Sequence, residues 1–306
     1  MRIFVSLAAF CEPLLEFTLD GLFSRADRPD GIYVGLVDQN FVSAREWLMT
    51  KPYAQQVRYL LIDPIDSLGV CWARHLAFSL YQGETFVLQI DSHMHFEPAW
   101  DRRLIESLEY LRSAVQRPIL TTYPPPFEFD EQGQPRPTLT PAGTVYGLRK
   151  RADCELRDDS ATLRFEVEHL HGSSYVEGHH VAAGFLFTLG QFIEEIPYDP
   201  FLYFHGEEQS LALRAYTRGW TILHPQHELI PLYHLYKQAG ESYLSHHWHP
   251  AYEAKRQIKF TDLEKRAEAR LLALVSGRLS GPYGLGAVRS LADFMQISGL
   301  DYRRYQ

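Results

Sequence analysis

The stretch Thr85–Phe96, TFVLQIDSHMHF, decides the fold class, because an apolar run typical of a buried strand ends abruptly in polar residues. The run 85–90 has the composition of a strand that is covered on both faces. Asp91 and His93 follow it, two residues apart. Side chains two apart on an extended segment point to the same side. The stretch therefore predicts a sheet strand that carries a carboxylate and an imidazole together at its carboxyl end.

Similar apolar segments alternate with helical patterns on both sides of this stretch. We expect further buried strands at 3–8, 32–37, 57–62 and 118–122, and helices at 13–23, 70–81 and 100–116. This alternation predicts an α/β protein with a mainly parallel central sheet flanked by helices on both faces. Ligands of such sheets bind at the carboxyl ends of strands, which is where Asp91 and His93 lie.

The second half of the chain begins with a segment of different composition. Residues 123–159 are rich in Pro, Gly, Thr and charged residues, which predicts one long mobile loop that serves as a lid or acceptor-side loop. Strand patterns return at 161–170, 179–189, 221–224 and 229–236. Helices are expected over 206–219 and from Ala251 onward, and a capping box of Ser290 and Asp293 opens the last one.

Composition and charge limit the possible classes of function. Of 306 residues, 45% are hydrophobic and 22% are charged, as in ordinary globular proteins, and the formal net charge is -8. A net acidic chain does not suit general nucleic-acid binding, which needs a basic face. No apolar run approaches the length of a membrane span, so we expect no transmembrane segment.

The cysteines and the N-terminal sequence together predict a cytoplasmic protein. Cys11, Cys71 and Cys154 are odd in number and far apart, which favours reduced thiols over a disulfide framework. The N-terminal run has one basic residue and a short apolar core. We interpret it as a first buried strand rather than a signal peptide. The sequence does not indicate an oligomeric state.

Three groups of residues could carry chemistry. Asp91 and His93 together suit Mn²⁺, and Mg²⁺ less well, although such a pair also occurs as a plain polar turn. Glu207 and Glu208 open a predicted helix, where the macrodipole favours acidic residues. Alternatively one of them, preferably Glu207, faces a sugar hydroxyl as a positioning group or base. His234, within the apolar LYHLY, is either a core residue or a third metal ligand brought from a distant segment.

Two histidine clusters could also suggest a metal site. They are the pair His179 and His180 and the run His246–His249. Neither has a cysteine partner or an established ligand spacing. We therefore interpret both clusters as surface or loop residues.

Several segments together resemble one known family of enzymes. They are GVCWARHLAFSLYQGETFVLQIDSHMHFEPAWD (69–101), PILTTYPPPFE (118–128), AAGFLF (182–187), YDPFLYFHGEEQSLALRAYTRGW (198–220) and LYHLY (232–236). In this order and spacing they are similar to the GlcNAc-transferase family whose best-known members modify hydroxyproline of the ubiquitin-ligase adaptor Skp1 in protists. The likeness extends from Arg2 to about Tyr236, and the closing LADFMQISGLDY (291–302) also resembles that family.

The resemblance implies a type-A glycosyltransferase fold, a Rossmann-like architecture of nucleotide-diphospho-sugar transferases. It implies a catalytic domain over 1–238, with a donor half of about 1–122 and an acceptor half of about 160–238. A helical C-terminal extension, 239–306, is expected to pack on this domain. The implied reaction is metal-dependent transfer of GlcNAc from UDP-GlcNAc, with retention of configuration. The acceptor is a hydroxyl of hydroxyproline, serine or threonine in a protein, or of a glycan.

The resemblance also implies roles for individual residues. The metal positions, for Mn²⁺ or Mg²⁺, are matched by Asp91, His93 and His234, and the acidic catalytic pair by Glu207 and Glu208. The donor-binding positions are matched by Ser6, Ala8, Arg74, Asp91, Ser92 and Gly184. The loop of Phe10, Cys11 and Glu12 departs from the family pattern, so the donor contacts of that loop stay open.

Two other functions are compatible with the same residues. One is a metal-dependent hydrolase of a sugar or nucleotide-sugar that uses Asp91, His93 and His234 as zinc ligands. The other is a non-catalytic sugar-binding module. The combination of a strand-end D-x-H with a late acidic pair favours the transferase, because a hydrolase does not need a donor-binding half.

Overall fold

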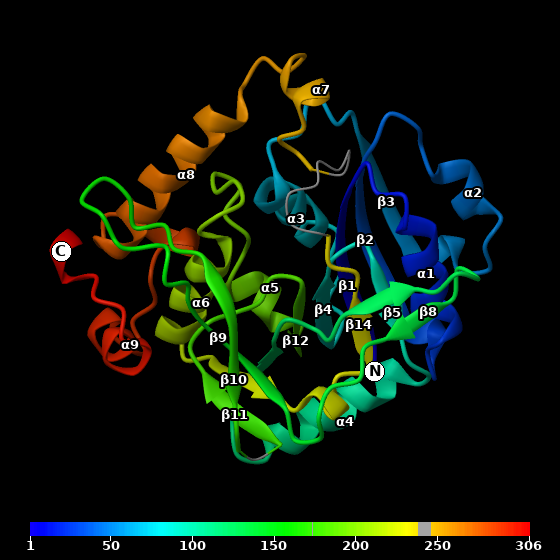
Figure 1. Ribbon diagram of the computed structural model, residues 1–306, viewed down its shortest axis with the longest axis horizontal. Coiled ribbons are helices and arrows are strands. Elements are labelled where there is room, and N and C mark those ends of the chain that lie inside the picture. Colours follow the sequence, from blue (N-terminus) through cyan, green and yellow to red (C-terminus); the bar gives the residue numbers. More distant parts are fainter. Residues whose placement is uncertain (173, 238–245) are drawn as a thin grey trace.

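The computed structural model describes residues 1–172, 174–237 and 246–306. They form an α/β fold around an eight-stranded sheet (Figure 1). The strand order is β11 (Tyr175–Gly178), β13 (Thr221–Pro225), β6 (Pro118–Thr121), β12 (Phe185–Leu189), β4 (Phe86–Ile90), β1 (Ile3–Phe10), β2 (Ile32–Gln39) and β3 (Val57–Ile62). The expected α/β class with a central sheet is confirmed.

The sheet is mainly parallel, with one insertion that the sequence pattern does not predict. Strands β4, β1, β2 and β3 run parallel, as alternating strands and helices require. Strand β6 is parallel to β13 but does not adjoin β4. Strand β12, from the second half of the chain, lies between β4 and β6 and is antiparallel to both. Strand β11 is antiparallel to β13.

Helices cover both faces of the sheet. Helices α1 (Leu15–Ser24), α2 (Arg45–Met49) and α4 (Trp100–Arg112) contribute to one hydrophobic core, and α3 (Val70–Phe78), α5 (Gln191–Glu195) and α6 (Glu207–Thr217) contribute to the other. In β1, Ile3 and Val5 belong to the first core and Phe4 to the second. This alternation is that of a strand buried on both sides. Short 3₁₀ helices span Pro29–Gly31, Ala54–Gln56, His227–Leu229, Gly281–Tyr283 and Arg303–Tyr305.

The C-terminal part is helical, as expected. Its helices are α7 (Pro250–Glu253), α8 (Phe260–Val275) and α9 (Leu291–Ser298), and Figure 1 shows α8 and α9 on the same side of the molecule as α6. Leu271 and Phe294 are buried in the core that also holds Leu211 of α6. The predicted capping box of Ser290 and Asp293 is present at α9. The expected domain division near 238/239 falls outside the described residues.

The segment 123–159 is not the single long loop that its composition suggests. It contains β7 (Phe127–Phe129), β8 (Pro135–Pro137) and β9 (Val145–Lys150), and β9 pairs with β10 (Phe165–Leu170). Phe127, Val145 and Leu148 are buried. The prolines and glycines separate short strands here, and the few apolar residues between them are enough to anchor the segment to the core.

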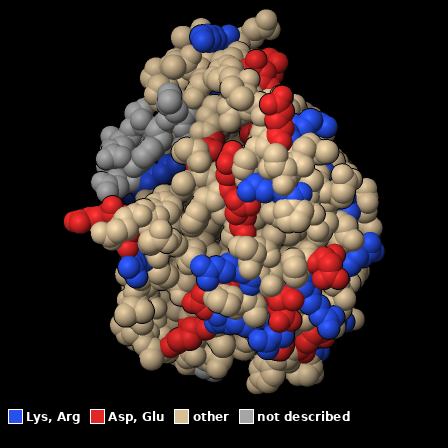
Figure 2. All heavy atoms as spheres, turned by 90° about the vertical axis from the view of Figure 1, so that its right-hand side faces the viewer, with Lys and Arg blue, Asp and Glu red and all other residues tan. Residues whose placement is uncertain are grey.

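One face of the molecule has a mixed distribution of charge (Figure 2). Among the described helices, none is both long and apolar enough to cross a membrane. On the face drawn in Figure 2, basic and acidic side chains are interspersed and do not form a continuous basic patch.

Candidate functional site

A small two-stranded sheet brings distant residues to the carboxyl end of β4. Strand β5 (Met94–Phe96) follows Asp91 and His93 directly, and it pairs antiparallel with β14 (Leu232–His234). In this register His234 lies opposite Met94. The N–H of Leu235 donates to the His93 carbonyl and extends this pairing. The N–H of His234 donates to the Pro125 carbonyl and ties β14 to a second segment. The pairing explains how residues more than a hundred positions apart meet.

Asp91, His93 and His234 form a compact cluster of potential ligand atoms. One such atom from each residue lies within 4.8 Å of the others. The Nε2 atom of His234 is 3.0 Å from Asp91 Oδ2 and 3.1 Å from His93 Nε2. On the far side of the His93 ring, Nδ1 lies 2.9 Å from Oε2 of Glu12. The structure thus brings together the three residues that the sequence and the resemblance suggest as metal ligands.

The electrostatics of the cluster favour the protonation states that metal ligands need. Partial burial alone would raise the pKa of the Asp91 carboxyl, but the hydrogen bond with His234 and the charge of Arg74 outweigh it and hold that pKa far below its usual range. Burial lowers the pKa of His234 in spite of its bond to Asp91. At neutral pH the pair is therefore a carboxylate beside a neutral imidazole.

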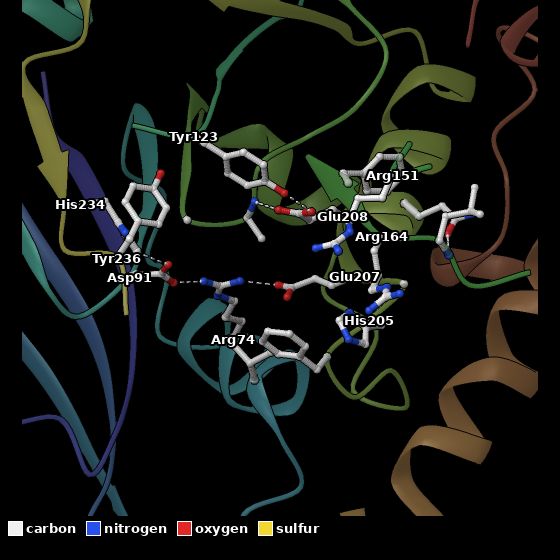
Figure 3. A pocket seen from close by; sticks show the side chains of 18 of the residues that line it. Arg74, Asp91, Tyr123, Arg151, Arg164, His205, Glu207, Glu208, His234 and Tyr236 are labelled. Atoms are coloured by element: carbon white, nitrogen blue, oxygen red, sulfur yellow. Dashed lines mark hydrogen bonds and ion pairs between the residues drawn. The ribbon is translucent and has the colours of Figure 1, made fainter. Parts of the chain in front are cut away.

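Arg74 links the cluster to the acidic helix start (Figure 3). It projects from α3, and its Nη2 atom lies 2.6 Å from Asp91 Oδ1 while its Nη1 atom lies 2.5 Å from Glu207 Oε1. The side chains of Arg74 and Glu207 are only 4% and 6% exposed. A charge-assisted pair in such surroundings holds both partners in fixed positions. Glu207 is therefore committed to Arg74.

Glu208 has different partners and different surroundings. Its Oε1 accepts the backbone N–H of Ala183 at 2.9 Å and its Oε2 accepts the Tyr123 hydroxyl at 2.9 Å (Figure 3). Burial raises the pKa of the Glu208 carboxyl to about 7, against the lowering effect of these two hydrogen bonds. In the described part of the chain, no basic side chain lies within ion-pair distance of the Glu208 carboxylate, whereas Arg74 lies that close to Glu207. Near neutral pH this carboxyl can therefore gain or lose a proton.

Two cavities meet at the ligand cluster. The glutamate cavity, of about 340 Å³, is lined by Arg74, Tyr123, Glu207 and Glu208 among others. The strand-end cavity, of about 290 Å³, lies at the carboxyl ends of β1, β2 and β4 and is lined by Ala8, Phe10, Glu12, Gln39, Ser92, His93, Lys237 and His247 among others. Asp91 and His234 line both cavities. The cluster is thus shared by two binding spaces.

The other residues expected to bind the nucleotide-sugar donor do not all line the same cavity. Ala8 and Ser92 line the strand-end cavity, and Gly184 lines the glutamate cavity. A Cβ atom on Gly184 would lie 2.7 Å from Asp91 Oδ2, so only glycine leaves room for this carboxylate. Ser6 is fully buried inside β1 and lies in the lining of neither cavity. The structure therefore does not bring Ser6 to the site.

The two histidine clusters lie in loops, as expected, but two of their members are buried rather than on the surface. His180 is buried, and its ring centroid lies 4.3 Å from that of Phe165. His247 is also buried, and its Nε2 and Nδ1 atoms lie 3.0 Å from the Ser67 carbonyl and 2.8 Å from the Tyr203 hydroxyl. Local composition does not reveal that rings from distant elements enclose these side chains.

Sequence reasoning missed three residues of the site. Glu12 orients His93, Tyr123 donates to Glu208, and Lys237 lies in the strand-end cavity. Burial lowers the pKa of Lys237, while the negative charges of Glu12 and Asp91 act in the opposite direction. The only indication of Glu12 in the sequence was that residues Phe10–Glu12 depart from the family pattern.

The donor set of the cluster fits a divalent cation. A carboxylate and two imidazoles suit Mn²⁺ better than Mg²⁺, which prefers oxygen ligands only. The bond from His93 to Glu12 is the carboxylate–histidine arrangement that usually orients a metal-binding imidazole. Since Nδ1 of His93 faces Glu12, Nε2 of His93 is directed at the other two ligands. The residues present could therefore hold such a cation.

Comparison with known proteins gives a family match that covers nearly the whole chain. The family model described as Glycosyltransferase (GlcNAc) matches residues 2–54 and 49–304. No curated protein matches the chain. The crystal structure of GalNAc-T7 with UDP, GalNAc and Mn²⁺ is similar to the entire chain, with 14% sequence identity and a TM-score of 0.61. The chain spans 56% of the length of the GalNAc-T7 chain.

Two structures of S. aureus TarS are more distantly similar. Residues 1–349 of TarS in complex with UDP-GlcNAc match 97% of this chain and 82% of theirs, with 12% identity and a TM-score of 0.44. The structure of TarS 1–349 matches 77% of this chain and 60% of its own, with 14% identity and a TM-score of 0.44.

Proposed function

The chain belongs to the GlcNAc glycosyltransferase family and has a type-A glycosyltransferase fold, and on this premise we propose a reaction and a role for each site residue. The proposed reaction transfers GlcNAc from UDP-GlcNAc to a hydroxyl group of a protein or glycan, with a divalent cation and with retention of configuration. The observation that carries the proposal is the position of Asp91 and His234 at the junction of two cavities.

The strand-end cavity is the proposed site of the UDP part of the donor. It lies at the carboxyl ends of parallel strands, where ligands of such sheets bind. Phe10 and His247 give it aromatic walls, and their ring centroids are 5.2 Å apart. Lys237 supplies a positive charge near Asp91 and Glu12, suited to a diphosphate. The sugar part of the donor would then extend past the cluster into the glutamate cavity.

The proposed metal ligands are Asp91, His93 and His234. A divalent cation held there would neutralise the negative charge that grows on the departing UDP. Glu12 keeps the His93 imidazole in the orientation that this role needs. Gly184 leaves the space that the Asp91 carboxylate occupies.

The proposed role of Arg74 is to hold the side chains around the nucleotide-sugar donor in fixed positions. Its guanidinium fixes Asp91 on one side and Glu207 on the other, and both contacts are short. A preorganised charge in a largely buried site costs little reorganisation when the bond to UDP breaks. Glu207 therefore acts through Arg74 and not directly on the acceptor.

Glu208 is the proposed acceptor-facing carboxylate, in place of the initial preference for Glu207. It lies on the glutamate cavity and has a pKa of about 7, so that it can accept a hydrogen bond from an attacking hydroxyl. Tyr123 and the Ala183 N–H fix its orientation. In the transfer, the acceptor oxygen bonds to the anomeric carbon, its proton passes to the Glu208 carboxylate, and the bond from that carbon to UDP breaks.

A panel of UDP-sugars tests the proposal and separates it from the hydrolase alternative. UDP release should be greatest with UDP-GlcNAc and Mn²⁺, should fall to background with chelator, and should increase when a hydroxylated acceptor is added. NMR of the product should show the anomeric configuration of the donor. Release that is insensitive to chelator, or hydrolysis that no acceptor diverts into product, would contradict the proposal.

A further inference from the structure

The outer side of the glutamate cavity carries positive charge. Arg151 follows β9, Arg164 precedes β10, and His205 precedes α6, and all three line this cavity. Figure 3 shows Arg151 and Arg164 on the side away from Asp91, with Glu208 between. The side chains of Arg151 and Arg164 are each 43% exposed, so a ligand in the cavity can reach them.

One carboxylate only partly neutralises this pair of arginines. Nε and Nη2 of Arg151 bind Asp153 at 2.9 and 2.8 Å, and Nη2 of Arg164 binds the same carboxylate at 3.1 Å. Partial desolvation and the positive charges of Arg164 and Arg151 lower the pKa of His205, so His205 is neutral at pH 7. Two guanidinium groups against one carboxylate leave an excess of one positive charge.

The inner side of the same cavity has the opposite character. There Arg74 is shared between two carboxylates, those of Asp91 and Glu207, and Glu208 adds a third acidic group. An acceptor bound in this cavity therefore meets hydrogen-bond acceptors at its inner end and guanidinium donors at its outer end. A neutral hydroxyl suits the first environment and an anion suits the second.

We propose that the acceptor is a sugar that carries a phosphate or carboxylate group, which Arg151 and Arg164 bind while its hydroxyl faces Glu208. This inference rests on the proposed function and narrows its acceptor. Arginine pairs recognise oxyanions through parallel hydrogen bonds, and phosphate and carboxylate share this chemistry. Tyr123, Phe165, Phe204 and Tyr236 also line the cavity, and such rings pack well against the C–H faces of a pyranose.

Matched neutral and anionic probes test the proposal. Binding of glucose, glucose 6-phosphate and glucuronate is measured by calorimetry with the protein saturated in UDP and Mn²⁺, so that the probes do not compete for the cation. The wild type should bind at least one anionic probe about tenfold more tightly than glucose. The comparison of the two anionic probes distinguishes phosphate from carboxylate.

Variants assign the preference to the arginine pair. The double variant Arg151→Gln and Arg164→Gln should bind the anionic probes and glucose equally, within about twofold, at unchanged melting temperature. Arg149→Gln is the matched control, because Arg149 lies on β9, pairs with Glu166 and does not line the cavity. Asp153→Asn should strengthen the preference, since it removes the competing carboxylate.

Several results would overturn the proposal. It is wrong if the wild type binds glucose and both anionic probes alike, or binds none of them. It is also wrong if the double variant keeps the preference or if Arg149→Gln loses it. UDP binding and hydrolysis of UDP-GlcNAc are measured on the same samples. Intact donor activity without an anion preference would refute this inference alone, whereas absence of donor binding would refute the proposed function.

Discussion

Replacement of Glu208 by glutamine should change how the stability of the protein depends on pH. The side chain keeps its shape and its hydrogen-bond acceptor for the Ala183 N–H, but it can no longer ionise. In the folded protein burial raises the pKa of Glu208 from 4.5 to about 7. The folded state therefore binds this proton more tightly than the unfolded chain does. Between these two pKa values Glu208 is ionised in the unfolded chain but protonated in the folded protein, so the free energy of unfolding falls as pH rises.

The size of the effect follows from the two pKa values. The difference between 4.5 and about 7 corresponds to roughly 3 kcal/mol, at about 1.4 kcal/mol for each pKa unit. Below about pH 4.5 Glu208 is protonated in both states and contributes no difference. The free energy of unfolding of Glu208→Gln, relative to the wild type, should rise between about pH 4 and pH 7 by up to this amount and stay constant at higher pH.

Urea denaturation of both proteins across this pH range measures the difference. Other groups titrate in both proteins, so subtracting one curve from the other isolates Glu208. Glu131→Gln is a suitable control for the loss of one carboxylate, because Glu131 lies in an exposed turn.

Acceptor-dependent transfer by the wild type should increase about tenfold from pH 6 to pH 8, with a midpoint near 7, as Glu208 ionises. Glu208→Gln should lose this rise together with most of the activity. A stability difference that does not vary with pH, or a variant that keeps the wild-type pH profile, would refute the reasoning.

Three further substitutions test the contacts around the cluster. Gly184→Ala places a Cβ atom 2.7 Å from Asp91 Oδ2 and should weaken Mn²⁺-supported UDP binding about tenfold in calorimetry, with little change in melting temperature. Arg74→Gln leaves the buried Glu207 carboxylate without its positively charged partner and should lower the free energy of unfolding by about 3–5 kcal/mol in urea denaturation. Glu12→Gln should reduce Mn²⁺ affinity by about 10–100-fold in calorimetry with the metal alone.

The parallel part of the sheet could be predicted from the sequence almost to the residue. Strand β3 begins and ends where the apolar run 57–62 does, and β1, β2 and β4 differ from expectation by two residues or fewer at each end. The length of an apolar run that turn residues bound indicates the length of the strand. The position of β12 could not be predicted, because periodicity identifies strands but does not specify their neighbours.

The site was predicted in part, for a related reason. Asp91 and His93 are two apart on one segment, so their closeness follows from local geometry. From the residues alone His234 stayed open between core and ligand, and only the family resemblance assigned it to the metal positions, because its approach depends on two three-residue strands pairing across the chain. The role of Glu12 depends on a turn in which Cys11 has a φ of 44°, a left-handed conformation that few residues other than glycine adopt. The residue types around Cys11 do not predict that turn.

The most direct test of the account is calorimetry of UDP binding with Mn²⁺ and with chelator, for the wild type, Asp91→Ala and His234→Ala. The wild type should bind UDP much more tightly with Mn²⁺ than with chelator. Both variants should lose this difference but keep a cooperative unfolding transition, because the ligand cluster lies at the end of the sheet and not in its core. The central claim is that these residues form a metal-dependent nucleotide-sugar site. It would be contradicted if Mn²⁺ increased the UDP affinity of the wild type and of Asp91→Ala equally, or did not increase that of the wild type.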